Sequence, residues 1–381
     1  MKSIRVIVKV TNACNLRCKY CYNSETEYNK EILPLERFEK LIRMLAKDYT
    51  HITVTWHGGE PLYCGLEYYQ KAMAIMNELT LMLGVKIRNS VQTNGTLIDN
   101  KWIEFFKKND WNVGISFDGL EHNKYRAAAD KTLAALKMLK NAGIKFGTLA
   151  VVPEGYDVAA NYEYFKSLGY DVEFSPLFLE GGGKDMRQEE SFAKQMNDLF
   201  DKWLFDTEGV GVRTFYNYIS MAVGGPYRVC SYNSCVTKFL CLAADGTIYN
   251  CSRHSVMAYP FANVDEINSS AEIFATEGFA EFLKGNVERR RKCLETCDLY
   301  DYCCGGCPDC AILENGLSNP PLKTCATFKA IFTHVKAKIE KVIADGTPLS
   351  KLNPQVKRVL ASACAVGETS PENNELDRYG E

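Results

Sequence analysis

No stretch of the sequence approaches the roughly 18 consecutive apolar residues that a membrane-spanning helix needs. A secretory signal is also absent, because residues 1–5 lead into a short apolar run with no small-residue cleavage site after it. We therefore expect a cytoplasmic protein, whose thiols stay reduced. Basic residues are not in excess, since 45 Lys and Arg face 47 Asp and Glu. This balance indicates that neither nucleic acid nor a membrane is a partner.

Cysteine, in contrast, is abundant, with 16 residues in a chain of 381. In a reducing compartment so many thiols indicate metal or redox chemistry rather than disulfides. They are also clustered: four precede residue 230, eleven lie between 230 and 325, and Cys364 stands in the tail. Cysteines that only fill a hydrophobic core would be scattered.

The first part of the chain alternates between short β-branched runs and longer periodic segments. The predicted strands are 4–10, 52–56, 85–92, 111–116, 144–151 and 172–174. The predicted helices are 35–47, 66–83, 99–108, 130–141, 158–168 and 191–205. Six such pairs predict a parallel α/β fold, in which ligands bind at the carboxyl ends of the strands.

Composition divides the chain into four parts. We expect a barrel-like domain over 1–206, a bridging region over 207–229, a cysteine-rich domain over 230–327, and a C-terminal helix and tail over 328–381. A closing helix is predicted at 324–344 and a flexible glycine-rich loop at 180–184. The charged segment 370–381 is expected to be frayed.

The first cysteine group follows the first predicted strand with the spacing C-x3-C-x2-C, at Cys14, Cys18 and Cys21. Three thiolates on one short loop can ligate three irons of a cubane cluster and leave the fourth iron open. Electron-transfer clusters are usually closed by four cysteines. Zinc is the alternative, although zinc sites usually combine two cysteine pairs.

This triplet, with aromatic Tyr20 before Cys21, resembles the motif of the radical S-adenosylmethionine (SAM) superfamily. The Gly-Gly-Glu-Pro segment at 58–61 resembles the motif that holds the amino group of SAM in that family. Polar residues at the next strand ends also match positions that contact SAM. The residues expected to contact SAM are Gly58, Gly59, Glu60, Gln92, Asn94, Ser116 and Arg126, and Tyr22 either packs near SAM or belongs to the core.

The resemblance implies a partial TIM-like (β/α)6 barrel and a [4Fe–4S] cluster that binds SAM. In this family an electron from the cluster cleaves SAM, and the resulting 5′-deoxyadenosyl radical abstracts a hydrogen atom from the substrate. An electron donor such as flavodoxin or ferredoxin is then a required partner. Glu60 and Asp118 are the carboxylates nearest the predicted site, although the sequence assigns neither as a base.

The second cysteine group packs six thiols into residues 293–310 around Gly305 and Gly306. Upstream, residues 243–249 read as a small hairpin with an Asp-Gly turn. Eight thiolates would satisfy two further iron–sulfur clusters, and zinc ribbons are the structural alternative.

This segment resembles the SPASM extension of radical SAM enzymes that modify peptides and proteins. The resemblance implies two auxiliary [4Fe–4S] clusters. Their expected ligands are Cys230, Cys235, Cys251 and Cys307 for one, and Cys293, Cys297, Cys303 and Cys325 for the other. Cys241 competes with Cys235, Cys304 with Cys303, and Cys310 with Cys307, so the register stays open.

Within this group the layout looks most like anaerobic sulfatase-maturating enzymes, which oxidise a cysteine or serine to formylglycine. That family places an aspartate, the proposed base, directly after the hairpin cysteine. Here Ser252 follows Cys251, and a serine hydroxyl is a poor base at neutral pH.

We therefore favour a maturase that abstracts hydrogen from a ribosomal precursor peptide and then forms a thioether or carbon–carbon cross-link or performs another oxidation. Sulfatase maturation is the alternative, and a non-enzymatic zinc or iron–sulfur scaffold is a third. Only 13 residues precede Cys14, so a leader peptide would be read by the barrel, by the cysteine-rich region or by a separate protein. We expect His57 to be a turn residue and the basic run 289–292 to be a solvated helix end.

Overall fold

The computed structural model describes residues 2–24, 31–184, 186, 189–225, 229–232, 235–253 and 255–366, and the side chains of residues 189, 255 and 363–366 are not described. The Cys364 side chain and the segment 370–381 therefore lie outside the described residues. Within the described part of the chain, none of the helices combines the length and apolar character that crossing a bilayer requires.

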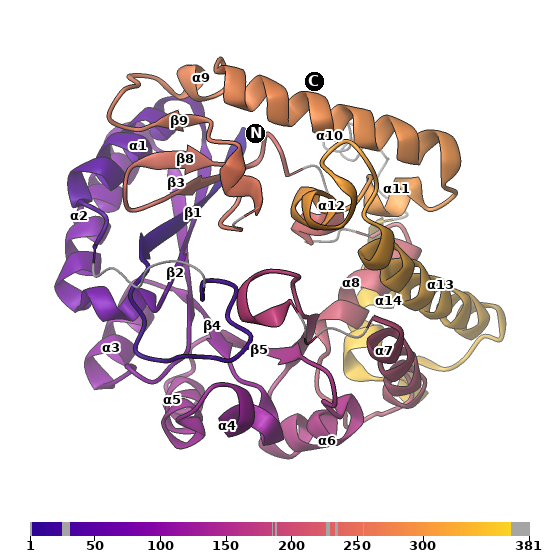
Figure 1. Ribbon diagram of the computed structural model, residues 1–381. Coiled ribbons are helices and arrows are strands. Elements are labelled where there is room, and N and C mark those ends of the chain that lie inside the picture. Colours follow the sequence, from indigo (N-terminus) through magenta and orange to yellow (C-terminus); the bar gives the residue numbers. More distant parts are fainter. Residues whose placement is uncertain are drawn as a thin grey trace.

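Six parallel strands form the centre of the molecule, in the order β6-β5-β4-β3-β2-β1. They are β1 (Ser3–Thr11), β2 (His51–Gly58), β3 (Lys86–Thr93), β4 (Asn112–Ser116), β5 (Phe146–Val152) and β6 (Val172–Pro176). Each corresponds to one predicted strand, with ends that differ by at most two residues. The strands follow an open arc with helices on its outer side (Figure 1), as expected for a partial (β/α)6 barrel.

The six predicted helices are also present. They are α1 (Leu35–Asp48), α2 (Leu66–Leu83), α3 (Asn100–Lys108), α5 (Ala129–Asn141), α6 (Val158–Leu168) and α7 (Glu189–Trp203), with the short helix α4 (His122–Tyr125) between β4 and α5. Local chemistry sets several ends. The side chains of Asp99 and Asp157 cap α3 and α6 by accepting from Trp102 N and Ala160 N. Gly84 ends α2 in the left-handed conformation that favours glycine.

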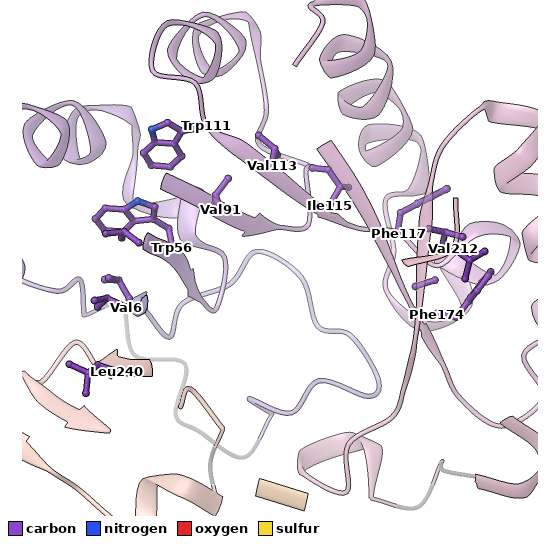
Figure 2. Packing of buried hydrophobic residues seen from close by; sticks show 14 of the residues in the cluster. Val6, Trp56, Val91, Trp111, Val113, Ile115, Phe117, Phe174, Val212 and Leu240 are labelled. Atoms are coloured by element: carbon purple, nitrogen blue, oxygen red, sulfur yellow. The ribbon is translucent and has the colours of Figure 1, made fainter. Parts of the chain in front are cut away.

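A continuous hydrophobic core lies between the strands and the outer helices (Figure 2). Trp56 on β2 and Trp111 just before β4 are both buried and stack with ring centroids 6.2 Å apart. The Tyr69 ring from α2 meets both indoles edge to face. This aromatic cluster fixes α2 against the sheet.

The cysteine-rich region extends the same sheet, a feature that the sequence did not reveal. β7 (Phe239–Leu242) pairs in parallel with β1, and β8 (Thr247–Tyr249) and β9 (Ala262–Asn263) continue it antiparallel. The predicted hairpin is confirmed as the turn between β7 and β8. Because β7 has only four residues, its pairing with β1 left no periodic signal in the sequence.

Helices complete the region and close the open side of the arc (Figure 1). They are α8 (Arg213–Ala222), α9 (Ser270–Ile273), α10 (Glu277–Thr296), α11 (Tyr300–Cys303), α12 (Pro308–Asn315), α13 (Leu322–Ala344) and α14 (Pro354–Val366). The predicted closing helix is α13. It packs on α7 and α8, and Asp201 of α7 pairs with His334 and Lys338 of α13 at 2.8 and 2.9 Å.

The expectation of a solvated basic run at 289–292 is wrong for its first residue. Arg289 is 2% exposed and donates hydrogen bonds to the carbonyl oxygens of Gly305 and Leu317 at 3.0 and 2.8 Å. It also donates to Asn286 Oδ1. Arg289 therefore holds the loop that carries the late cysteines, whereas Arg291 pairs with Glu288 and Glu295 at the surface.

We predict that Trp111→Ala lowers the free energy of unfolding by about 3–5 kcal/mol, because it opens a cavity inside the aromatic cluster. Urea unfolding followed by circular dichroism measures this change. Leu81→Ala, at a side chain that is 86% exposed on α2, is the matched control and should change stability by less than about 0.5 kcal/mol. Equal effects of the two substitutions would contradict the packing described.

Candidate active site

The first cysteine group lies on the loop 12–24, directly after β1. This cysteine loop has no helix or strand of its own, and its three thiols are half-buried. Burial, opposed by the Leu16 amide and reinforced by the charges of Glu60, Cys18 and Cys21, raises the pKa of Cys14 to about 11. Thiolates at this position therefore need a compensating positive charge, which a metal cluster supplies.

The Gly-Gly-Glu loop at the end of β2 packs against the backbone that leads into the cysteines. Gly59 N donates to Thr11 O at 2.7 Å, and Glu60 N donates to Ala13 O at 2.8 Å. A Cβ atom on Gly59 would lie 2.1 Å from Ala13 O. Only glycine therefore allows this approach of the two backbones.

The Glu60 side chain, 1% exposed, points inward and organises the loop. Its carboxylate accepts from Leu62 N at 3.0 Å, Thr93 Oγ1 at 2.6 Å and Asn94 N at 2.8 Å. These hydrogen bonds join the ends of β2 and β3. The geometry gives Glu60 a positioning role and argues against it as a base.

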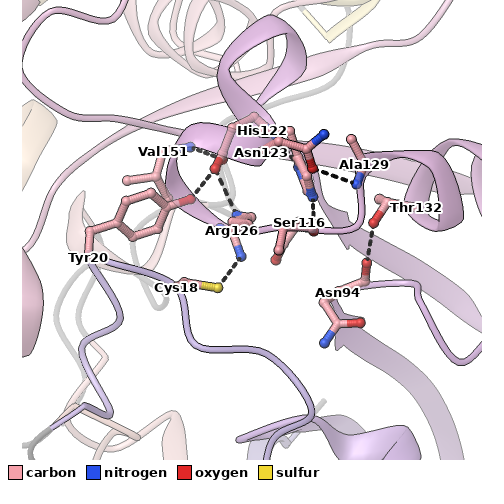
Figure 3. A network of polar contacts seen from close by, with 12 residues as sticks. Cys18, Tyr20, Asn94, Ser116, His122, Asn123, Arg126, Ala129, Thr132 and Val151 are labelled. Atoms are coloured by element: carbon pink, nitrogen blue, oxygen red, sulfur yellow. Dashed lines mark hydrogen bonds and ion pairs between the residues drawn. The ribbon is translucent and has the colours of Figure 1, made fainter.

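Asp118, after β4, is the centre of a second buried network. Its partners Tyr20, Arg126 and Val151 are labelled in Figure 3. Its carboxylate accepts from Arg126 Nε at 2.9 Å, from Val151 N at 3.0 Å and from the Tyr20 hydroxyl. The Arg126 guanidinium also reaches Cys18 Sγ at 3.8 Å. Burial lowers the pKa of Arg126, but the charges of Asp118, Tyr20 and Cys18 raise it by more, so the net pKa is above the usual value. The guanidinium therefore stays charged beside the cysteine.

The other predicted SAM-contacting residues lie at the same end of the barrel. Asn94 donates to Asn15 Oδ1 of the cysteine loop at 2.9 Å. Gln92 Nε2 donates to Ser116 Oγ at 3.0 Å, which links the ends of β3 and β4. The Tyr22 hydroxyl lies 3.3 Å from His57 Nδ1.

The glycine-rich segment expected to be a flexible loop is instead packed on the cysteine loop. It contains the short 3-10 helix η3 (Gly181–Gly183). Gly182 N donates to Cys21 O at 3.1 Å and to Ser24 Oγ at 2.9 Å. Cβ atoms on Gly181 and Gly182 would lie 2.4 and 2.1 Å from the carbonyl oxygens of Cys21 and Lys19.

Sequence reasoning missed a group of charged residues inside the barrel mouth. Lys9, although on β1, is 3% exposed and donates to Asn23 Oδ1 at 3.3 Å. Glu180 is 4% exposed, and the Arg253 guanidinium lies over the Tyr22 and Phe178 rings, 4.7 and 3.3 Å from their centroids. The available signal was Lys9 between Val8 and Val10 near the carboxyl end of β1, where a buried charge needs polar partners.

The later cysteines form two further groups. Cys293, Cys297, Cys303 and Cys325 line a common cavity of about 100 Å³ between α10 and α13. Cys304 does not line it and has a left-handed φ of 50°. The four thiols around this space have the donor set that an iron–sulfur cluster requires.

The other group joins the hairpin to α12. Burial is the largest cause that raises the pKa of Cys235, and the charges of Cys230, Cys307 and Cys251 come next. These four thiols are therefore neighbours. Cys241, in contrast, lies near Lys9 and Asp245. Cys310 lies within 4.8 Å of both Cys307 and Asp309, so the choice between Cys307 and Cys310 stays open.

We predict that Asp118→Asn lowers SAM cleavage at least about tenfold, because one amide oxygen cannot receive three inward-pointing donors and the Arg126 charge loses its partner. The yield of 5′-deoxyadenosine per enzyme measures this loss. Asp130→Asn, on the exposed face of α5, is the control and should leave cleavage unchanged. Full activity of the Asp118 variant would contradict the positioning role.

Comparison with known proteins agrees with this geometry. The model of the radical SAM superfamily matches residues 8–162. A cysteine-type anaerobic sulfatase-maturating enzyme of Clostridium perfringens is 27% identical over 360 residues, covering 88% of this chain and 96% of the relative. A serine-type enzyme of Bacteroides thetaiotaomicron is 27% identical over 379 residues, covering 88% and 90%.

Solved structures give the same result. The structure of anSMEcpe with bound AdoMet and the Cp18Cys peptide has a TM-score of 0.78 and 25% identity, covering 90% of this chain and 99% of that one. Streptococcus suis SuiB bound to its precursor peptide SuiA shares the fold, with a TM-score of 0.62, 16% identity, and coverage of 85% and 76%. Residues 8–162 thus carry the radical SAM domain of an enzyme that is similar over most of its length to the anaerobic sulfatase-maturating enzymes, with SAM and a [4Fe–4S] cluster as cofactors.

Proposed function

We propose that Cys14, Cys18 and Cys21 ligate the SAM-binding cluster and that the loops around them hold SAM. The Gly58–Gly59 backbone faces the cysteine loop, and Asn94 and Arg126 each contact that loop directly. When bound, the cluster and SAM supply a radical that removes a hydrogen atom from the substrate. The chain's own residues orient SAM and keep water out of the barrel mouth.

We further propose that the later cysteines hold two auxiliary clusters that carry electrons. The support is their arrangement in two groups of four, one of them around a cavity. The region 230–327 would then act as a functional unit, although β7 joins it to the barrel sheet. An electron donor such as flavodoxin or ferredoxin would reduce the SAM-binding cluster.

This assignment predicts different effects for two adjacent cysteines. Cys303→Ala should remove one auxiliary cluster and lower the iron content of anaerobically reconstituted protein by about four atoms. Cys304→Ala should leave the iron content unchanged, because Cys304 does not line the cavity. The reverse result would make Cys304, instead of Cys303, the ligand of the auxiliary cluster.

For the reaction itself, we propose oxidation of a cysteine or serine of a substrate protein to formylglycine. The observation that carries this proposal is the match to sulfatase-maturating enzymes of both types over nearly the full length of each chain. The charged residues inside the barrel mouth, Lys9, Glu180 and Arg253, offer a buried surface on which a substrate segment can be oxidised away from water.

Peptide cross-linking, which the sequence favoured, is the second candidate. Ser252, 6% exposed beside Cys251, stands where the sulfatase-maturating enzymes carry an aspartate. This difference is the specific observation in its favour. The likeness to SuiB supports only the shared fold. Only in this case would a leader peptide have to be read, by the barrel, by the cysteine-rich region or by a separate protein.

Mass spectrometry of a peptide that carries a sulfatase target cysteine decides between the two. We expect reduced enzyme and SAM to convert the cysteine to formylglycine, and peptides with alanine at that position to remain unchanged. Loss of two hydrogens with retention of the sulfur would contradict the proposal and support a cross-link. The Cys14→Ala variant is the control that should form no product.

A further inference from the structure

The proposed oxidation needs a proton acceptor inside the barrel, and the following inference rests on that proposed function. After one hydrogen atom leaves the substrate Cβ, formation of a carbon–sulfur or carbon–oxygen double bond requires loss of one more electron and one proton. An auxiliary cluster held by the later cysteines would supply the acceptor for the electron. The proton leaves the thiol or hydroxyl and must pass to a side chain.

Most polar groups around the site cannot receive it. The carboxylates of Glu60 and Asp118 already accept three hydrogen bonds each. Burial, together with the charges of Arg253 and Lys9, lowers the pKa of His57 to about 3, so its protonated form is not available near neutral pH. Burial raises the pKa of Tyr22, whose phenol therefore keeps its proton.

Glu180 is placed differently. It precedes Gly181 and Gly182, whose backbones press on the Cys21 and Lys19 carbonyls, so its segment borders the SAM-binding cluster site. The side chain is buried and does not cap η3. A buried carboxylate next to the predicted radical site is therefore present although residue 252 is a serine.

Arg253 connects Glu180 to the auxiliary region. Its guanidinium lies over the ring of Phe178, on the same loop as Glu180, and over Tyr22 on the cysteine loop. Its backbone neighbour is Ser252, beside Cys251. The charges of Glu180 and Cys251 thus both act on Arg253, which links the segment beside the cysteine loop to one proposed electron acceptor.

Two cationic side chains, Lys9 and Arg253, interact electrostatically with the Glu180 carboxylate. Burial lowers the pKa of Lys9, and the charges of Cys241 and Glu180 oppose this change. Burial also lowers the pKa of Arg253, which the charges of Tyr22, Asp309, Cys251 and Glu180 more than offset. Asp309, the other buried carboxylate near Arg253, belongs to the Cys307 and Cys310 group.

We propose that Glu180 is the general base of the second half-reaction. Its carboxylate accepts the proton of the substrate thiol or hydroxyl while the substrate radical gives one electron to an oxidised auxiliary cluster. The carbon–hydrogen and sulfur–hydrogen bonds break, and a carbon–sulfur double bond forms. Water then hydrolyses the thioaldehyde to the aldehyde and hydrogen sulfide; a serine substrate yields the aldehyde directly.

Glu180→Gln tests this role, because it keeps the size of the side chain and removes its basicity. With a peptide deuterated at the target Cβ, the variant should still transfer deuterium to 5′-deoxyadenosine within about twofold of wild type. The ratio of oxidised peptide to 5′-deoxyadenosine should fall at least about tenfold. Electron paramagnetic resonance of freeze-quenched samples should show more substrate radical than in wild type.

Glu163→Gln, on the exposed face of α6, is the matched control and should match wild type in all three readouts. Glu180→Asp keeps the charge beside Lys9 and Arg253 but withdraws the carboxylate by one methylene, so its product ratio should lie between the other two. If Glu180→Gln does not fold, the Asp variant alone decides, with a fall of at least about threefold expected. An unchanged product ratio in the folded variant overturns the proposal.

The test of Glu180 as the base can be read whether the product is formylglycine or a cross-link. Wild-type enzyme that produces a cross-link instead of formylglycine would contradict the proposed function. Cross-linking by this route also releases one electron and one proton after hydrogen abstraction. The effect of Glu180→Gln on the product ratio would then be measured on the cross-linked product.

Discussion

The cysteine loop has no regular structure, so the loops that pack against it must impose its shape. Gly59 approaches it from the end of β2, Gly181 and Gly182 from beyond β6, and Arg126 from beyond β4. At each glycine a side chain would collide with a backbone carbonyl. The cofactor site therefore depends on backbone contacts between loops, and the parallel sheet matters because it brings these loop ends to one edge.

Buried charge gives the site its second level of order. The Asp118–Arg126 pair is buried and satisfied by further hydrogen bonds, which is the condition under which such a pair is tolerated. Lys9, Glu180 and Arg253 form a separate charged group on the inner side of the barrel mouth. The first group orders the cysteine loop, and the second lines the space where we propose that the substrate is oxidised.

Much of this architecture could be predicted from the sequence. The alternating strands and helices are strongly periodic, and the motif residues at Cys14, Gly59 and Asn94 occupy the strand ends where ligands bind. The pairing of β7 with β1 could not be predicted, because a four-residue strand carries no periodicity and its partner lies more than 200 residues away. The burial of Arg289 was missed because a basic run usually marks a solvated surface, whereas here loop carbonyls receive the guanidinium.

The positions of Glu180 and Arg253 were equally hidden, since tertiary packing alone brings the loop after β6 beside Arg253, two residues after Cys251. We propose that three loops shape a cluster site with one open iron. Anomalous diffraction at the iron edge from anaerobically grown crystals with SAM tests it most directly. We predict iron at the cysteine triplet. The fourth iron should be bound by SAM and by no fourth protein ligand. A fourth cysteine on that iron, or zinc in its place, would contradict the account.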